Sequence, residues 1–144
     1  MIETKKSGIG MDLDRLYKNF EVLENWQDRY RFIIEMGKKI PQLQESDKTE
    51  ENRVHGCISK VYMVINQTQE IPPRVHFVAN SDAMIVNGLI AIMQIVYDGK
   101  TIEEISAVNI DSIFKKLGLE SHLSPNRRNG FFAMAERLRA LSKQ

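Results

Sequence analysis

Residues 61–97 read VYMVINQTQEIPPRVHFVANSDAMIVNGLIAIMQIVY, and this stretch decides the fold. It contains two segments in which apolar and polar side chains alternate, as they do in half-buried strands. The apolar positions are Val61, Met63 and Ile65 in the first segment and Val75, Phe77 and Ala79 in the second. Residues 66–73, which include two adjacent prolines, separate them. The stretch therefore predicts a β-hairpin with a connection of several residues.

The same stretch ends in a run, residues 83–97, that is apolar on nearly every face of a helix. A helix of this kind is normally buried in the centre of a domain. Gly99 follows it and suits the C-terminal cap. The run is interrupted by Asn87 and Gln94 and is too short to span a bilayer, so we expect a core helix and no membrane partner.

Two helical patterns precede this centre. The first begins at Asp12, and the second runs from Trp26 to Lys39. A polar connection, residues 42–53, follows them and has room for one helical turn. We expect a short strand near Arg53–Val54 to complete the sheet.

Three helical patterns follow the centre. Thr101 and Glu104 have capping-box spacing and predict a short helix, and residues 111–117 suit another. Ser124 and Pro125 suit the N-cap and first position of a last helix. The fold class that we expect is α+β, with a small antiparallel sheet of about three strands packed against surrounding helices.

The composition is that of an ordinary soluble domain. The chain has 144 residues, with 20 Lys+Arg against 19 Asp+Glu and a net charge of +1. We expect residues 1–11 to form a flexible N-terminal leader and residues 12–144 to form a single domain. The near-zero net charge argues against broad binding to nucleic acid or to an anionic membrane. The leader lacks the apolar core of a signal peptide, so we expect a cytoplasmic protein.

The chain contains one cysteine, Cys57. One thiol cannot form an internal disulfide, and it cannot supply the ligands of a structural zinc site or an iron–sulfur cluster. Gly56 directly precedes it, so a loop before the first strand can present the thiol to another protein. The alternative is that Cys57 is a small buried hydrophobe, as lone cysteines often are. A protonated His55 would lower the pKa of the thiol, but adjacent side chains of an extended chain point to opposite sides.

A second feature is the sequence Asn126-Arg127-Arg128 at the start of the last helix. Positive charges in a first turn oppose the helix macrodipole, which favours acidic residues there. A locally unfavourable choice of residue points to a function. The alternative is a pair of solvated arginines.

The residues around the cysteine carry a family resemblance. Residues 52–62, NRVHGCISKVY, resemble the active-cysteine loop of the SufE family of sulfur-acceptor proteins. Residues 25–37, 81–90 and 123–130 resemble further motifs of that family in the same order, so the similarity covers about residues 12–140. The chain departs from the common pattern at Ile58, where the family usually has Gln, and at Tyr62, where it usually has Trp.

The resemblance implies a sulfur relay, with Cys57 as the persulfide acceptor. It implies that the partner is a PLP-dependent cysteine desulfurase of the SufS type, which holds the PLP, so that this chain needs no cofactor of its own. It implies delivery to an iron–sulfur scaffold of the SufBCD type. The sequence leaves open whether the chain is a monomer or a homodimer. Arg127 matches a family arginine near the desulfurase interface, with Arg128 beside it. His55, Gly56 and Ile58 would support the loop, and family members shelter the cysteine in an apolar pocket until the desulfurase docks.

Three alternatives remain at this point. The chain could serve a different desulfurase, as CsdE-type relatives do. It could be an adaptor that carries no sulfur. It could be a hydrolase with a Cys57 nucleophile, which would need a general base such as His76 or His122. The sulfur relay makes the chain a sulfur-transfer partner and not a stand-alone enzyme.

Overall fold

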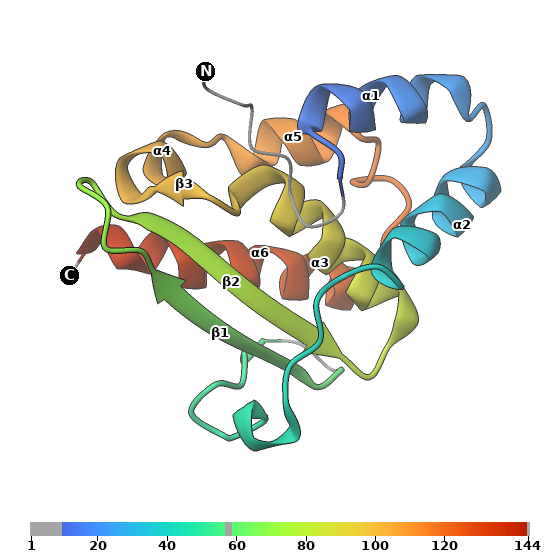
Figure 1. The fold of residues 1–144 in the computed structure, drawn as a ribbon. Helices are drawn as coiled ribbons and strands as arrows, with labels where there is room; N and C mark the ends of the chain where they lie inside the picture. The colour runs from blue at the N-terminus through green and yellow to red at the C-terminus, as the bar shows by residue number, and fades with distance from the viewer. Residues whose placement is uncertain (1–9, 57–58, 144) are drawn as a thin grey trace.

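The computed structural model describes residues 10–56 and 59–143 and has an α+β fold (Figure 1). The elements in chain order are α1 (Leu13–Val22), α2 (Trp26–Gly37), η1 (Glu45–Asp47), β1 (Val61–Gln67), β2 (Arg74–Ser81), α3 (Met84–Tyr97), β3 (Lys100–Thr101), α4 (Ile102–Ala107), α5 (Ile110–Lys116), α6 (Pro125–Arg139) and η2 (Ala140–Lys143). The predicted fold class is confirmed. Most of the predicted leader, residues 1–9, lies outside the described residues.

The predicted hairpin is the centre of the sheet. Strands β1 and β2 pair in antiparallel register from Val61 opposite Ser81 to Gln67 opposite Val75. The third strand, β3, pairs with the other edge of β2, so the order is β1-β2-β3. The chain reaches β3 through Gly99, which has a φ of +82° and donates its N–H to the Val75 carbonyl at 2.8 Å.

The prediction of the third strand at Arg53–Val54 is wrong. Arg53 forms only an isolated bridge with Tyr62. The Val54 N–H still donates to the Val61 carbonyl at 2.9 Å, but two residues later Gly56 turns the chain away with a φ of +96°. Pairing therefore stops after one bridge, and the two residues of β3 take the third position.

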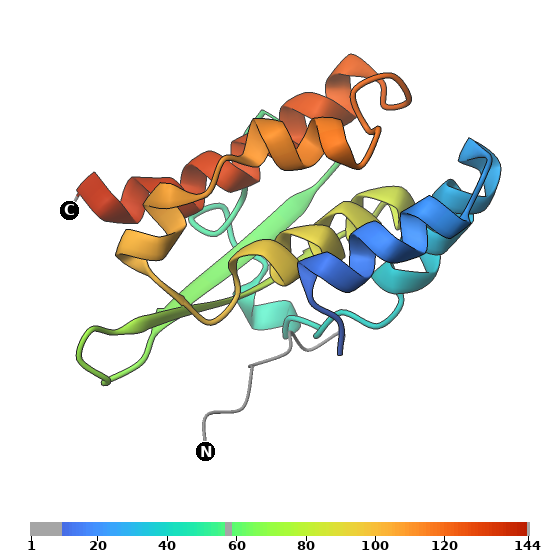
Figure 2. The same ribbon diagram turned by 90° about the horizontal axis from the view of Figure 1, so that it is seen from above.

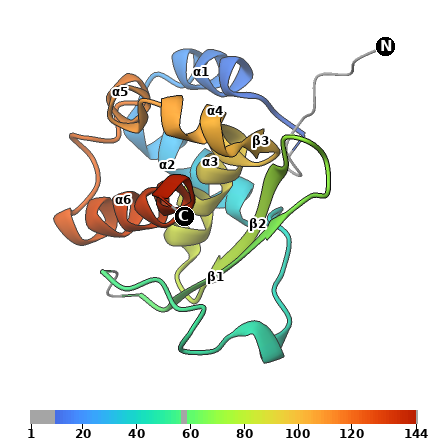
Figure 3. The same ribbon diagram turned by 90° about the vertical axis from the view of Figure 1, so that its left-hand side faces the viewer.

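Helix α3 forms the core of the protein, as its apolar sequence predicts. Its side chains Leu89, Ile90, Ile92 and Met93 are at most 1% exposed. The α-helices lie on one side of the hairpin, with α3 and α6 close to it (Figure 3). Helices α3 and α6 lie alongside each other and begin at the same end of the molecule (Figure 2). Their first turns therefore lie near each other.

Two glycines let α2 pack closely on α3. A Cβ added to Gly37 would lie 2.5 Å from the Gly88 backbone nitrogen, and a Cβ added to Gly88 would overlap the backbone and side chain of Ile33. Any larger residue at these positions would separate the two helices. Helix α2 ends at this contact, two residues before the predicted Lys39.

The predicted helix starts are confirmed. The Asp12 side chain accepts from the Arg15 N–H, and Ser124 accepts from the Arg127 N–H with Pro125 at the first position of α6. Thr101 and Glu104 form both hydrogen bonds of a capping box. Each cap satisfies N–H groups that have no partner within the helix. No helix among the described residues is long and apolar enough to cross a membrane.

Candidate functional site

The site is built around the segment that leads from η1 to β1. Residue Val54 is 3% exposed, and its N–H hydrogen bond to the Val61 carbonyl closes the base of a short loop. Gly56 follows in a left-handed conformation that only glycine adopts easily. A Cβ at this position would lie 3.4 Å from the Ala133 Cβ, so the loop runs directly beside α6.

Two of the predicted site residues, Cys57 and Ile58, lie outside the described residues. The chain is described again from Ser59 onward. The predictions for the acceptor thiol and for the isoleucine beside it therefore stay predictions. Their described neighbours in the sequence, Gly56 and Ser59, both lie close to α6.

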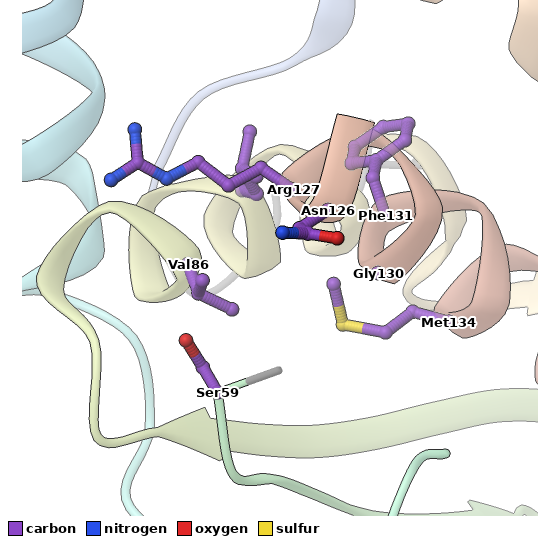
Figure 4. Close-up of a pocket in the computed structure, with 8 residues that line it drawn as sticks. Ser59, Val86, Asn126, Arg127, Gly130, Phe131 and Met134 are labelled. Atoms are coloured by element: carbon purple, nitrogen blue, oxygen red, sulfur yellow. The ribbon is translucent and has the colours of Figure 1, made fainter. Parts of the chain in front are cut away.

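Ser59 lines a small cavity of about 30 Å³ between the N-terminal parts of α3 and α6 (Figure 4). The other lining residues are Val86 and Leu89 of α3 and Asn126, Arg127, Gly130, Phe131 and Met134 of α6. A space of this size holds about one water molecule or a few side-chain atoms. The lining is mostly apolar, so the cavity suits a soft, poorly hydrated group more than an ion.

Arg127 is the charged residue of this lining. Its Nη1 donates to the Tyr30 hydroxyl at 3.2 Å, and its guanidinium carbon lies 6.0 Å from the centre of the Tyr30 ring. The side chain extends sideways from α6, and its guanidinium does not point toward Ser59 (Figure 4). Tyr30 thus holds the positive charge of Arg127 beside the cavity.

Arg128 is half-buried and is not part of the cavity lining. Its Nε is buried and has no hydrogen-bond partner among the described residues. The first turn of α6 carries no acidic residue. The two arginines therefore add positive charge to a helix start that is already electropositive.

The three histidines do not meet at the cavity. The His55 side chain is 71% exposed, with its Nε2 3.3 Å from Glu50 Oε1. His76 Nδ1 lies 3.1 Å from Asp98 Oδ2, and the His122 ring stacks on Trp26 at 4.3 Å. None of the three lines the cavity, so the described residues offer no general base for the hydrolase alternative there.

The same residues also lack a metal centre. The described part of the chain contains no group of three or more His, Cys, Asp or Glu side chains that could hold a metal ion.

Sequence reasoning missed several residues of the site. Ser59, Val86 and Met134 appear in the sequence only as parts of a loop or of apolar helix faces. The spacing of Asn126, Gly130 and Met134 by four residues places them on one face of α6. That spacing is a signal for the lining, but it does not distinguish a cavity wall from an ordinary packed face.

Comparison with known proteins identifies relatives along almost the whole chain. Residues 14–142 match the family model described as "SufE: Fe-S metabolism associated domain". An uncharacterized SufE-like protein of Rhizobium etli is 42% identical over 132 residues, which cover 91% of this chain and 89% of the relative. An uncharacterized SufE-like protein of Rhizobium meliloti is 41% identical over 129 residues, with coverages of 89% and 92%.

The fold has a relative among solved structures. The solution structure of a hypothetical protein from Thermus thermophilus superposes with a TM-score of 0.71 and covers 96% of both chains. The two sequences are 19% identical, so this similarity supports the fold alone.

Proposed function

The chain belongs to the SufE family, and from this premise we propose that it accepts persulfide sulfur on Cys57 from a PLP-dependent cysteine desulfurase. It then delivers the sulfur to iron–sulfur cluster assembly. Membership of the family indicates a sulfur-transfer role in iron–sulfur metabolism. The identities of the acceptor residue and of the desulfurase are the parts that we add.

The proposed step is a thiol–disulfide exchange in form. The Cys57 thiolate attacks the outer sulfur of the persulfide on the desulfurase, because a thiolate and not a thiol is the nucleophile. A sulfur–sulfur bond forms to Cys57 as the bond within the donor persulfide breaks. The cysteine of the desulfurase leaves as a thiolate. No net oxidation occurs, so the step needs no further reactant.

The single cysteine of the sequence is the observation that carries the proposal. A second nearby thiol would attack the new persulfide, form an internal disulfide and release sulfide before delivery. With one thiol in the chain this side reaction has no intramolecular route. The same thiol requires a reducing compartment to stay free, which fits a cytoplasmic protein.

The surroundings of the flanking residues support the proposal. Ser59 lines a mostly apolar cavity, and the charged residue of its lining is Arg127. An apolar wall limits the access of water and oxidants to a persulfide, which is otherwise oxidised readily. Arg127 beside the cavity and Arg128 next to it would meet acidic groups on the desulfurase and guide its approach.

Intact mass measured without reductant tests the proposal. We expect the protein to gain one sulfur atom when it is mixed with the desulfurase, PLP and cysteine, and Cys57→Ser to gain none. Reactions without the desulfurase are the control for sulfur adducts that form independently of that enzyme. A wild-type protein that stays unmodified beside an active desulfurase contradicts the sulfur-carrier function.

The same assay separates the alternatives. A desulfurase of the SufS type and the desulfurase that serves CsdE-type relatives are compared in parallel, and faster loading from one of them identifies the partner type. If the chain is an adaptor that carries no sulfur, wild type and Cys57→Ser should stimulate the desulfurase equally. We expect stimulation to be lost in the variant.

A further inference from the structure

Arg137 of α6 makes two hydrogen bonds that connect this helix to the segment before the acceptor loop. Its Nη1 donates to the Arg53 carbonyl and its Nη2 to the Glu51 carbonyl, each at 2.8 Å. These are charge-assisted bonds of short length, which are stronger than bonds between neutral groups. The arginine lies one helical turn beyond Ala133, the residue that faces Gly56.

The opposite edge of the same segment pairs with β1. The Asn52 carbonyl accepts from the Met63 N–H at 2.8 Å, and the Val54 N–H donates to the Val61 carbonyl at 2.9 Å. Residues 49–53 form turns, with the Asn52 N–H donating to the Thr49 carbonyl and the Arg53 N–H to the Glu50 carbonyl, and the carbonyls of Glu51 and Arg53 accept from Arg137 instead of from β1. Arg137 thus supplies, from α6, the hydrogen-bond donors for these two carbonyls.

The guanidinium suits this position for a geometric reason. It is planar and presents two N–H donors in a fixed fork, which reach two carbonyls that are two residues apart in the sequence. A lysine has one ammonium group and cannot reproduce the fork. The segment is thus fixed from both sides, by β1 and by α6, immediately before the loop begins.

We propose that Arg137 is a positioning residue for sulfur transfer. It fixes residues 51–54 against α6 and so sets where the chain leaves toward Cys57, with Gly56 beside Ala133. Its side chain acts on the backbone and does not touch the sulfur or the partner. The inference rests on the proposed function and adds a residue to it that neither the cavity nor the family match assigns.

The test compares Arg137→Gln and Arg137→Lys with wild type, and Arg139→Gln is the control. Arg139 lies on the same helix, and its removal changes the net charge by the same amount. Its Nη1 lies 3.6 Å from Glu136 Oε1, within α6. Amide hydrogen exchange at Val54 and Met63 reports how firmly the segment is held. Single-turnover sulfur loading over a range of desulfurase concentrations reports the function.

We expect Arg137→Gln to exchange these amides about tenfold faster and to lower the loading rate at saturating desulfurase about tenfold, since it loses two charge-assisted bonds. The desulfurase concentration for half-maximal loading should not change, because Arg137 does not face the partner. Arg137→Lys should lie between wild type and Arg137→Gln. Arg139→Gln should match wild type in both measurements.

Other outcomes overturn the inference. A purely structural role would lower the thermal stability and leave the loading rate of the folded protein unchanged. A partner contact would raise the half-maximal concentration and leave the saturating rate unchanged. If the wild type itself takes up no sulfur, the proposed function fails first. If the wild type loads normally and Arg137→Gln loads equally fast, only the role of Arg137 fails.

Discussion

Replacing Gly56 by alanine tests whether the backbone before the cysteine matters. Gly56 has a φ of +96°, beyond the region that residues with a Cβ adopt easily. Space is not the difficulty, because the new Cβ would lie 3.4 Å from the Ala133 Cβ, at ordinary contact distance. The cost is therefore conformational and amounts to about 1–2 kcal/mol for a non-glycine residue in left-handed backbone.

This energy lowers the population of the native loop conformation, relative to other conformations of the chain, by a factor of about 5–30. We expect urea unfolding to show a loss of about 1–2 kcal/mol in the free energy of unfolding. We also expect slower sulfur loading of Cys57 in the single-turnover assay. The matched control is Gly118→Ala, where φ is +73° and the nearest atom to the new Cβ is Arg29 Nη1, also at 3.4 Å. It should lose similar stability but load sulfur at the wild-type rate.

The reasoning is refuted if Gly56→Ala is as stable as wild type and loads sulfur equally fast. It is also refuted if Gly118→Ala slows loading to the same extent, since the effect would then come from global stability and not from the loop.

Two further predictions concern the core. Gly88→Ala should lower the free energy of unfolding by about 1–3 kcal/mol or more, because the new Cβ overlaps Ile33 of α2. Thermal melts measure this loss, and unchanged stability would contradict the close packing of α2 on α3. Tyr97→Phe should be neutral or stabilising at pH 7, because the Tyr97 hydroxyl is buried without a hydrogen-bond partner among the described residues, and a loss above about 1 kcal/mol would contradict this. Burial raises the pKa of Tyr97 to about 12 from 10.0, so the folded protein holds the phenol proton at pH values where the unfolded chain loses it. The wild type should therefore keep its full stability below pH 10 and lose stability relative to Tyr97→Phe between pH 10 and 12. The expected loss is about 1.4 kcal/mol per pH unit. Urea titrations of both proteins across that range measure the free energy of unfolding at each pH. Parallel curves of this energy against pH would show that the Tyr97 hydroxyl does not contribute.

Much of the fold follows from local pattern. The alternation in residues 61–79 predicts the hairpin, because burial on one face of a strand leaves every second residue apolar. The run at 83–97 predicts the buried helix, because burial on all faces leaves a nearly continuous apolar sequence. The caps at Asp12, Thr101 and Ser124 are equally local, since a side chain and an N–H three residues later decide them.

The third strand shows where local pattern fails. Lys100–Thr101 has two residues, too few to show any alternation. Its pairing with Arg74 and Val75 depends on where α3 returns the chain, which is a property of helix length and packing. The segment at Arg53–Val54 has a more strand-like sequence, yet Gly56 turns the chain away after one bridge.

The sequence by itself determined the family, the single thiol and the positions of most helices and strands, because these depend on neighbours along the chain. The tertiary structure decided which residues lie around the segments that flank the proposed acceptor, Cys57. Arg137 reaches the Arg53 carbonyl across 84 residues, and Arg127 reaches the Tyr30 hydroxyl across 97 residues. No local periodicity encodes such contacts. They exist because α2, α3 and α6 are packed in one arrangement, with Gly37 and Gly88 allowing α2 and α3 to approach.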